Sequence, residues 1–141
     1  MEFRDEFPQS TLVSEPAPGS ISLFHYTAKT ALKLPYYDRN PLCYVVAREG
    51  RNIFYGINLH YHPPANRESL IRYIDAGSDF TRLRGYHKYL KSYVNSPFLQ
   101  ISMEEWGKAV ALDSEQFVRD LGAIEIDISP STVYRKGFYK D

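Results

Sequence analysis

Between residues 21 and 61 the apolar positions follow the pattern of β-strands. Residues 21–27, 42–47 and 53–61 are short runs of strand length, rich in β-branched and aromatic side chains. The turn sequence Glu49-Gly50-Arg51-Asn52 separates the last two runs, so we predict that they pair as an antiparallel hairpin. Residues 34–41 include prolines, an aspartate and an asparagine, which predicts an irregular turn.

After Pro63-Pro64 the spacing of apolar residues changes to that of helices. Apolar side chains on one face predict a helix over residues 65–76. The same criteria predict helices over residues 81–94, from the capping-box sequence Ser102-Met103-Glu104-Glu105 through Val110, and over residues 113–121. Residues 124–128 then alternate isoleucine with acidic side chains, which predicts one returning strand.

Strands followed by helices and a single returning strand are typical of an α+β fold. We therefore predict a small antiparallel sheet, open or barrel-like, packed by three to four short helices. Residues 1–20 contain Pro8, Pro16 and Pro18 and little apolar periodicity, so we expect an extended N-terminal arm that lies along a partner subunit. Residues 21–141 are then one domain with a polar, aromatic C-terminal tail.

Composition excludes several classes of protein. The 141 residues include 17 Lys+Arg and 17 Asp+Glu, and a net charge of zero disfavours coating of nucleic acid by the whole surface. No apolar run approaches the roughly 18 residues of a membrane span, so we expect no membrane partner. Cys43 is the only cysteine, which excludes an intrachain disulfide and predicts a small buried side chain.

His60-Tyr61-His62 is the one pattern that suggests a metal. Residues i and i+2 of a strand share a face, so both imidazoles could meet one ion, with a third ligand from His25 or His87. Two structural histidines at a strand end are the favoured alternative, and we predict no metal and no cofactor. Because no phosphate-binding loop or nucleophile elbow is present either, we expect a protein that is not an enzyme.

Basic and aromatic residues alternate between positions 82 and 93. Arg82, Arg84, Lys88 and Lys91 are interleaved with tyrosines, a combination that can contact phosphates and stack on bases. A solvated helix face, or a surface that meets an acidic partner, explains the same residues. DNA is therefore an alternative partner rather than the favoured one.

Tyrosine is the most unusual feature of the composition, with 12 residues among an aromatic fraction of 15%. Tyrosine suits interfaces as well as cores, because its ring is apolar and its hydroxyl needs a partner. Several of the aromatic side chains fall in turns and in the tail rather than on core stripes, and these are our candidate interface residues: Tyr36, Tyr37, Tyr134, Phe138 and Tyr139.

Two segments carry a resemblance to a known family. Ala28-Lys29-Thr30 with Leu34-Pro35-Tyr36-Tyr37-Asp38 and Pro41-Leu42, and then Gly56-Ile57-Asn58-Leu59-His60-Tyr61-His62-Pro63-Pro64 with Arg67, resemble the signatures of a small protein of tailed bacteriophages. The family pattern has an apolar residue at the position of His62, which makes a shared metal pair less favoured. For the motif residues Asp38, Gly56, Asn58, His60, Tyr61 and Arg67 we predict structural roles. Gly56 would allow a close approach or a bulge, Asn58 and Tyr61 would bond the 34–41 turn, and Asp38 would pair with Arg39 or Arg67.

The resemblance implies a phage gene product. Our leading hypothesis is a non-enzymatic structural component of the virion, at the neck, tail or baseplate, that assembles in multiple copies in the host cytoplasm and contacts other virion proteins. The alternative is a DNA-binding, DNA-end-protecting or packaging-associated protein that uses the basic face from Arg82 to Lys91.

Overall fold

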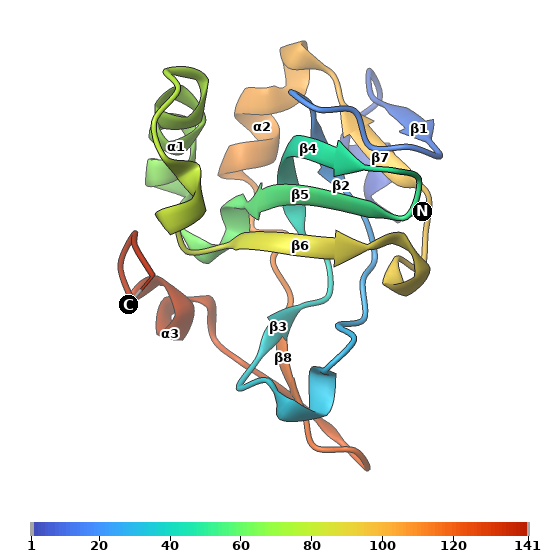
Figure 1. The fold of residues 1–141 in the computed structure, drawn as a ribbon, viewed down its shortest axis with the longest axis vertical. Coiled ribbons are helices and arrows are strands. Elements are labelled where there is room, and N and C mark those ends of the chain that lie inside the picture. Colours follow the sequence, from blue (N-terminus) through green and yellow to red (C-terminus); the bar gives the residue numbers. More distant parts are fainter. Residues whose placement is uncertain (1, 141) are drawn as a thin grey trace.

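The computed structural model describes residues 2–140, which form two antiparallel sheets and three α-helices (Figure 1). The strands are β1 Thr11–Val13, β2 Ile21–Leu23, β3 Tyr37–Asp38, β4 Leu42–Glu49, β5 Ile53–Asn58, β6 Tyr86–Leu90, β7 Phe98–Ile101, β8 Phe117–Asp120 and β9 Glu125–Asp127. The helices are α1 Pro64–Asp75, α2 Trp106–Ala111 and α3 Pro130–Tyr134. The predicted α+β fold is confirmed, and neither sheet of the described chain closes into a barrel.

The larger sheet has the strand order β1-β7-β2-β4-β5-β6, with β1 and β6 at its edges. The predicted hairpin is its centre: β4 pairs with β5, from Cys43 opposite Asn58 to Glu49 opposite Ile53. The register shifts between Val45 and Ala47, which marks a bulge in β4. The predicted helix over 65–76 is confirmed as α1, and it starts at Pro64, where a missing backbone N–H costs nothing.

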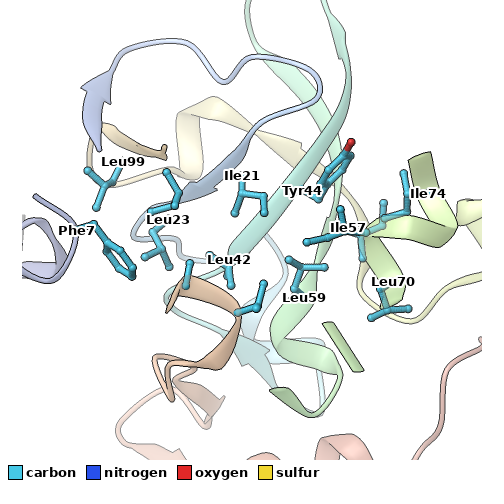
Figure 2. Close-up of a cluster of buried hydrophobic side chains, with 14 of the residues drawn as sticks. Phe7, Ile21, Leu23, Leu42, Tyr44, Ile57, Leu59, Leu70, Ile74 and Leu99 are labelled. Carbon is cyan, nitrogen blue, oxygen red and sulfur yellow. The ribbon is translucent and has the colours of Figure 1, made fainter. Parts of the chain in front are cut away.

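The main apolar core lies between one face of this sheet and helices α1 and α2 (Figures 1 and 2). Ile57 of β5 lies beside Leu70 and Ile74 of α1, and Ile21 and Leu42 lie in the middle of the same cluster (Figure 2). The opposite face of the sheet carries an aromatic cluster instead, composed of Phe24, Phe54, Tyr89 and Phe98 with Cys43 and Val45. Cys43 is fully buried there, as predicted.

The smaller sheet has the order β3-β8-β9 and extends below β6 in Figure 1. Residues 34–41 form the predicted irregular loop, but they also contribute β3. The returning strand is confirmed as β9, although both of its faces are exposed rather than one.

The predicted helix over residues 81–94 is wrong. Gly85 has φ +89° and breaks the helical path, and the chain then runs as β6 along the free edge of β5, with Ile57 opposite Tyr86. Lys88 is exposed and Tyr89 is buried, an alternation that is typical of a strand. The spacing of apolar residues fits a helix as well, and the pairing of β6 with β5 selects the strand.

The predicted helix over residues 113–121 is also wrong, because residues 117–120 form β8 between β3 and β9. The helix that follows Ser102 is confirmed, as a 3-10 turn over Met103–Glu105 that continues into α2. The capping box is not formed, since Ser102 N donates to Ser10 Oγ at 3.0 Å and Glu105 accepts from Gln9 N and Ser10 Oγ.

Residues 2–20, expected as an extended arm, contact the rest of the same chain. Phe7 is fully buried in the main core, and β1 pairs with β7 through Leu12 opposite Leu99. The hydrogen bonds from residues 9 and 10 to Glu105 tie this segment to the 3-10 turn that precedes α2. At the other end of the chain, helix α3 begins at Pro130 and ends at Tyr134, where the polar, aromatic tail was expected to start.

Candidate functional site

Asp38 in β3 is the centre of a buried polar network. Its Oδ1 accepts the backbone N–H groups of Asn40 and Gln116, both at 3.0 Å. Its Oδ2 accepts from Asn58 Nδ2 at 2.9 Å and lies 2.8 Å from His60 Nδ1. Because every lone-pair direction of the carboxylate is used, this short strand is fixed to the end of β5 and to the start of β8.

The charge on Asp38 is stabilised by these same donors. Burial raises the pKa of Asp38, but the imidazole of His60 and the hydrogen bonds from Asn58 and Asn40 outweigh burial, so the pKa is lowered from its ordinary value. The prediction that Asp38 pairs with Arg39 or Arg67 is wrong, because the side chain at Asp38 is His60, while Arg39 pairs with Glu125 and Arg67 with Glu115.

Ser114, His60 and Asp38 stand in the order of a hydrolytic triad. Ser114 Oγ lies 2.9 Å from His60 Nε2, and His60 Nδ1 lies 2.8 Å from Asp38 Oδ2. A nucleophile must also reach its substrate, yet His60 is fully buried and Ser114 is 8% exposed. This geometry therefore orients the imidazole and joins three segments of the chain, without room for a substrate.

Arg67 of α1 is completely buried and forms a second network. Its guanidinium donates to the backbone oxygens of Leu59, His62, Val110 and Leu112 and to Glu115 Oε2 and the hydroxyl of Tyr134. The Tyr134 hydroxyl in turn donates to Glu115 Oε1 at 3.0 Å. The planar donor fork of arginine matches this set of acceptors, so α1, α2 and α3 are connected through one side chain.

Two glycines permit close approaches that shape this region. A Cβ on Gly56 would overlap Cys43 Sγ and lie 2.7 Å from the carbonyl oxygen of Tyr44, on the neighbouring strand. The close approach predicted for Gly56 is confirmed, and the bulge lies across from it in β4. At Gly85 a Cβ would lie 2.6 Å from the carbonyl oxygen of Asn58, so no side chain fits at this position.

A cavity of about 140 Å³ lies where the loop containing β3 meets β6, beside the Asp38 network. It is partly open to solvent. Five tyrosines line it: Tyr26, Tyr36, Tyr37, Tyr61 and Tyr89. The rest of the wall is formed by Ala28, Leu34, Asp38, Pro41, Asn58, His87 and Lys88. Many of the motif residues of the sequence thus converge on one cavity.

The β6 wall of this cavity contains polar groups without partners. The hydroxyl of Tyr89 is buried and makes no hydrogen bond within residues 2–140. The ring of His87 packs edge-on against Tyr61, with centroids 5.1 Å apart, and burial lowers its pKa to about 4, so the imidazole is neutral at physiological pH. Lys88 is exposed and has no ion pair with any described residue.

The four basic residues predicted to form one face make different contacts in the structure. Arg84 donates to Val133 O at 2.6 Å and to the hydroxyl of Tyr36, and Lys91 binds Glu15 at 2.7 Å. Arg82 is exposed and lies over the ring of Tyr139, 5.5 Å from its centroid. Only Lys88 of the four lines the cavity, so the predicted basic face is divided by the strand geometry of β6.

The five predicted interface residues also separate into groups. Tyr36 and Tyr37 line the cavity, and Tyr37 is 5% exposed. Tyr134 is held by Arg67 and Glu115, as described above. Phe138 and Tyr139 are exposed by 44% and 49%, which leaves them available to a partner.

The four histidines do not converge on one point, as the disfavoured metal alternative would require. His60 lies in a 3-10 turn rather than a strand, and His62 Nε2 contacts the carbonyl oxygen of Arg84 at 2.8 Å. His25 Nδ1 contacts Asn40, and His87 is in the cavity wall. Within the described residues no group of three potential metal ligands comes together. The same part of the chain has no helix long and apolar enough to cross a membrane.

Sequence patterns did not reveal several residues of the site. Tyr26 lines the cavity, while Ser114 and Glu115 complete the two networks from positions far away in the chain. No local motif marks Ser114 or Glu115. Tyr26 is one of the many tyrosines of the sequence, but only the fold places it opposite β6.

Comparison with known proteins gives one match. The family model of the phage T4 terminal DNA protecting protein matches residues 3–76, just over half of the 141 residues. No curated protein and no solved structure matches the chain significantly. The matched range includes β3, β5 and Arg67, whereas β6 lies outside it. A family model that covers this share of the sequence establishes membership, and the predicted relation to a phage protein family is confirmed: the chain belongs to the phage T4 terminal DNA protecting protein family.

Proposed function

We propose that this protein binds the ends of phage DNA and protects them, and that it does so by occupancy rather than by catalysis. The family match is the observation that carries the proposal, because that family is named for the protection of terminal DNA. It favours our alternative hypothesis over the neck, tail or baseplate role. The buried position of Ser114 and His60 supports action without turnover.

The cavity supplies the chemistry that a DNA end needs. Aromatic rings offer faces on which a base can stack, and cations near the rings can neutralise phosphate. Lys88 lies in the wall, and the exposed Lys29 and Lys33 are next to Ala28 and Leu34, which line it. No described anion pairs with these three lysines.

An exonuclease assay tests the proposal directly. A linear duplex labelled internally and a circular duplex of the same sequence are incubated with the protein, and a double-strand exonuclease is added. The proposal expects slower digestion of the linear DNA, relieved by excess linear competitor but far less by circular competitor. Equal relief by both competitors would show binding without preference for ends and would contradict the proposal.

A role as a virion structural protein is a second candidate, carried by a different feature. Leu32, Leu121, Ile124 and Ile126 are 43–68% exposed around the turn between β8 and β9, and β9 is an edge strand with free backbone groups. Exposed apolar side chains beside an unpaired edge favour contact with another protein chain. Mass spectrometry of purified particles and the oligomeric state of an Ile124→Asp variant, compared with wild type, test this candidate.

A further inference from the structure

We propose that the tyrosine-lined cavity binds a single unstacked base, that of the terminal nucleotide, with a preference for pyrimidines. This inference rests on the proposed function, and it assigns the ligand to particular residues. The volume of the cavity fits one base. An apolar cavity of about 150 Å³ is known to hold benzene, so a cavity of about 140 Å³ accommodates one six-membered ring. The second ring of a purine would have to remain in the opening.

The lining suits a flat aromatic ligand. Tyr26, Tyr36, Tyr37 and Tyr61 surround the space, and a base can stack on such rings whatever its sequence identity. Tyr36 is held by Arg84, and Tyr61 packs against Tyr36 and Phe117 at centroid distances of 6.4 and 5.2 Å. The rings therefore lie in fixed positions before a ligand arrives, which lowers the entropy cost of binding.

The polar groups of the wall suit the edge of a base rather than a hydrocarbon. A buried hydroxyl without a partner is costly, so the unpaired hydroxyl of Tyr89 needs an explanation. The neutral imidazole of His87 has one donor and one acceptor nitrogen, and no described residue bonds either. Donor and acceptor groups along a pyrimidine edge would satisfy both side chains.

Lys88 sets the direction of the bound nucleotide. It lies between His87 and Tyr89 in β6, it is one of the residues that line the cavity, and its side chain is exposed. A base that enters the cavity leaves its sugar and phosphate at the opening, within the range of a long flexible cation. His87 and Tyr89 share one face of β6 and provide edge recognition, and the exposed Lys88 between them adds a positive charge at this edge strand.

Terminal abasic DNA provides the test. Binding is measured for wild type with duplexes that carry a terminal thymidine, an abasic site in its place, or an abasic site at the duplex centre. We expect the terminal abasic site to weaken binding about 5- to 150-fold, the range of one lost base stack, and the central one to have no effect. His87→Leu removes the unpaired nitrogens, and Ala28→Leu fills the cavity. In both variants the difference in affinity between the terminal thymidine duplex and the terminal abasic duplex should disappear.

The matched control is Tyr55→Leu, which removes a half-buried tyrosine of β5 outside the cavity lining and should keep the wild-type preference. Circular dichroism establishes that each variant is folded. If Ala28→Leu does not fold, His87→Leu decides. Wild type that protects ends yet ignores the terminal base would overturn the cavity inference and leave the proposed function intact.

Thymidine 5′-monophosphate separates the two proposals when end protection itself fails. Chemical shifts of His87 and Tyr89 that move with this nucleotide in wild type, with no movement of the Tyr89 signal in His87→Leu, would support the cavity as a nucleotide site. No shift at millimolar nucleotide would overturn the inference, whatever the outcome of the exonuclease assay.

Discussion

The buried polar network and the tyrosine-lined cavity share Asp38 and Asn58, yet they differ in how completely their polar groups are bonded. On the network side, the polar side-chain groups of Asp38, His60 and Arg67 all have hydrogen-bond partners. On the cavity side, the Tyr89 hydroxyl and the His87 ring have none among the described residues, and Lys88 has no ion pair.

This difference separates stability from binding. A satisfied buried group contributes to a unique fold, whereas an unsatisfied one is a cost that a ligand can remove. Removal of a network residue should therefore reduce stability, and removal of a cavity residue should change binding with little effect on stability. The predictions below test this contrast, from the largest expected effect to the smallest.

Arg67→Met should give the largest loss. The substitution keeps much of the apolar volume but leaves Glu115 buried without its cation and several carbonyl oxygens without donors. We expect a loss of about 3–5 kcal/mol in the free energy of unfolding, measured by urea denaturation. Arg72→Met is the control on the same helix, since its side chain is 69% exposed, and it should change stability by less than about 0.5 kcal/mol. Similar losses for both variants would remove the distinction.

Asp38→Asn should cost less, about 1–3 kcal/mol at pH 7, because one acceptor is replaced by a donor among existing donors. The folded pKa of Asp38 lies below its ordinary value of 3.8, so the stability it contributes is present above that pH and is lost as the pH falls through the folded pKa. The gap between wild type and variant should therefore narrow below about pH 4. A gap that stays constant down to pH 2 would contradict a charged Asp38.

The sequence predicted the first half of the chain better than the second, and the reason is the range of the interactions. The β4–β5 hairpin and α1 depend on local turns and periodicity, and both were predicted correctly. Strands β6 and β8 are set by neighbours: Tyr86 pairs with Ile57, and Val118 pairs with both Tyr37 and Asp127. Local spacing alone favoured helices there.

The candidate site shows the same limit. Motifs identified Asp38, Asn58 and Tyr61, but they gave Asp38 the wrong partner, because His60 reaches it from the 3-10 turn after β5. The basic segment appeared as one helix face, and only the strand geometry shows that Lys88 lines the cavity while Arg84 does not. A cavity formed by the meeting of a loop and an edge strand leaves no local pattern in the sequence.

His87→Leu tests the cavity side through pH. Burial lowers the pKa of His87 to about 4, below the ordinary 6.5, so the unfolded chain takes up a proton between these values while the folded protein does not. Wild-type stability should therefore fall as the pH falls from about 6.5 to 4, and the slope of the variant should be shallower. At pH 7.5 the two proteins should differ by less than about 1 kcal/mol. The measurement is the melting temperature of both proteins at pH 7.5 and pH 4.5. An equal decrease for wild type and His87→Leu would show that His87 takes up its proton in the folded state as well.

Lys88→Ala should leave stability almost unchanged, within about 0.5 kcal/mol, because the exposed ammonium has no ionic partner in the described chain. If Lys88 contacts a phosphate, its removal should reduce the slope of log K against log salt by about 0.9 for linear duplex DNA. Lys136→Ala is the matched control, since Lys136 is also exposed and unpaired among the described residues but follows α3, outside the cavity lining. Its salt slope should equal that of wild type. Equal salt slopes for all three proteins would place Lys88 away from the phosphates. A loss in stability larger than about 1 kcal/mol in Lys88→Ala would show that this part of β6 contributes to stability as the satisfied network does.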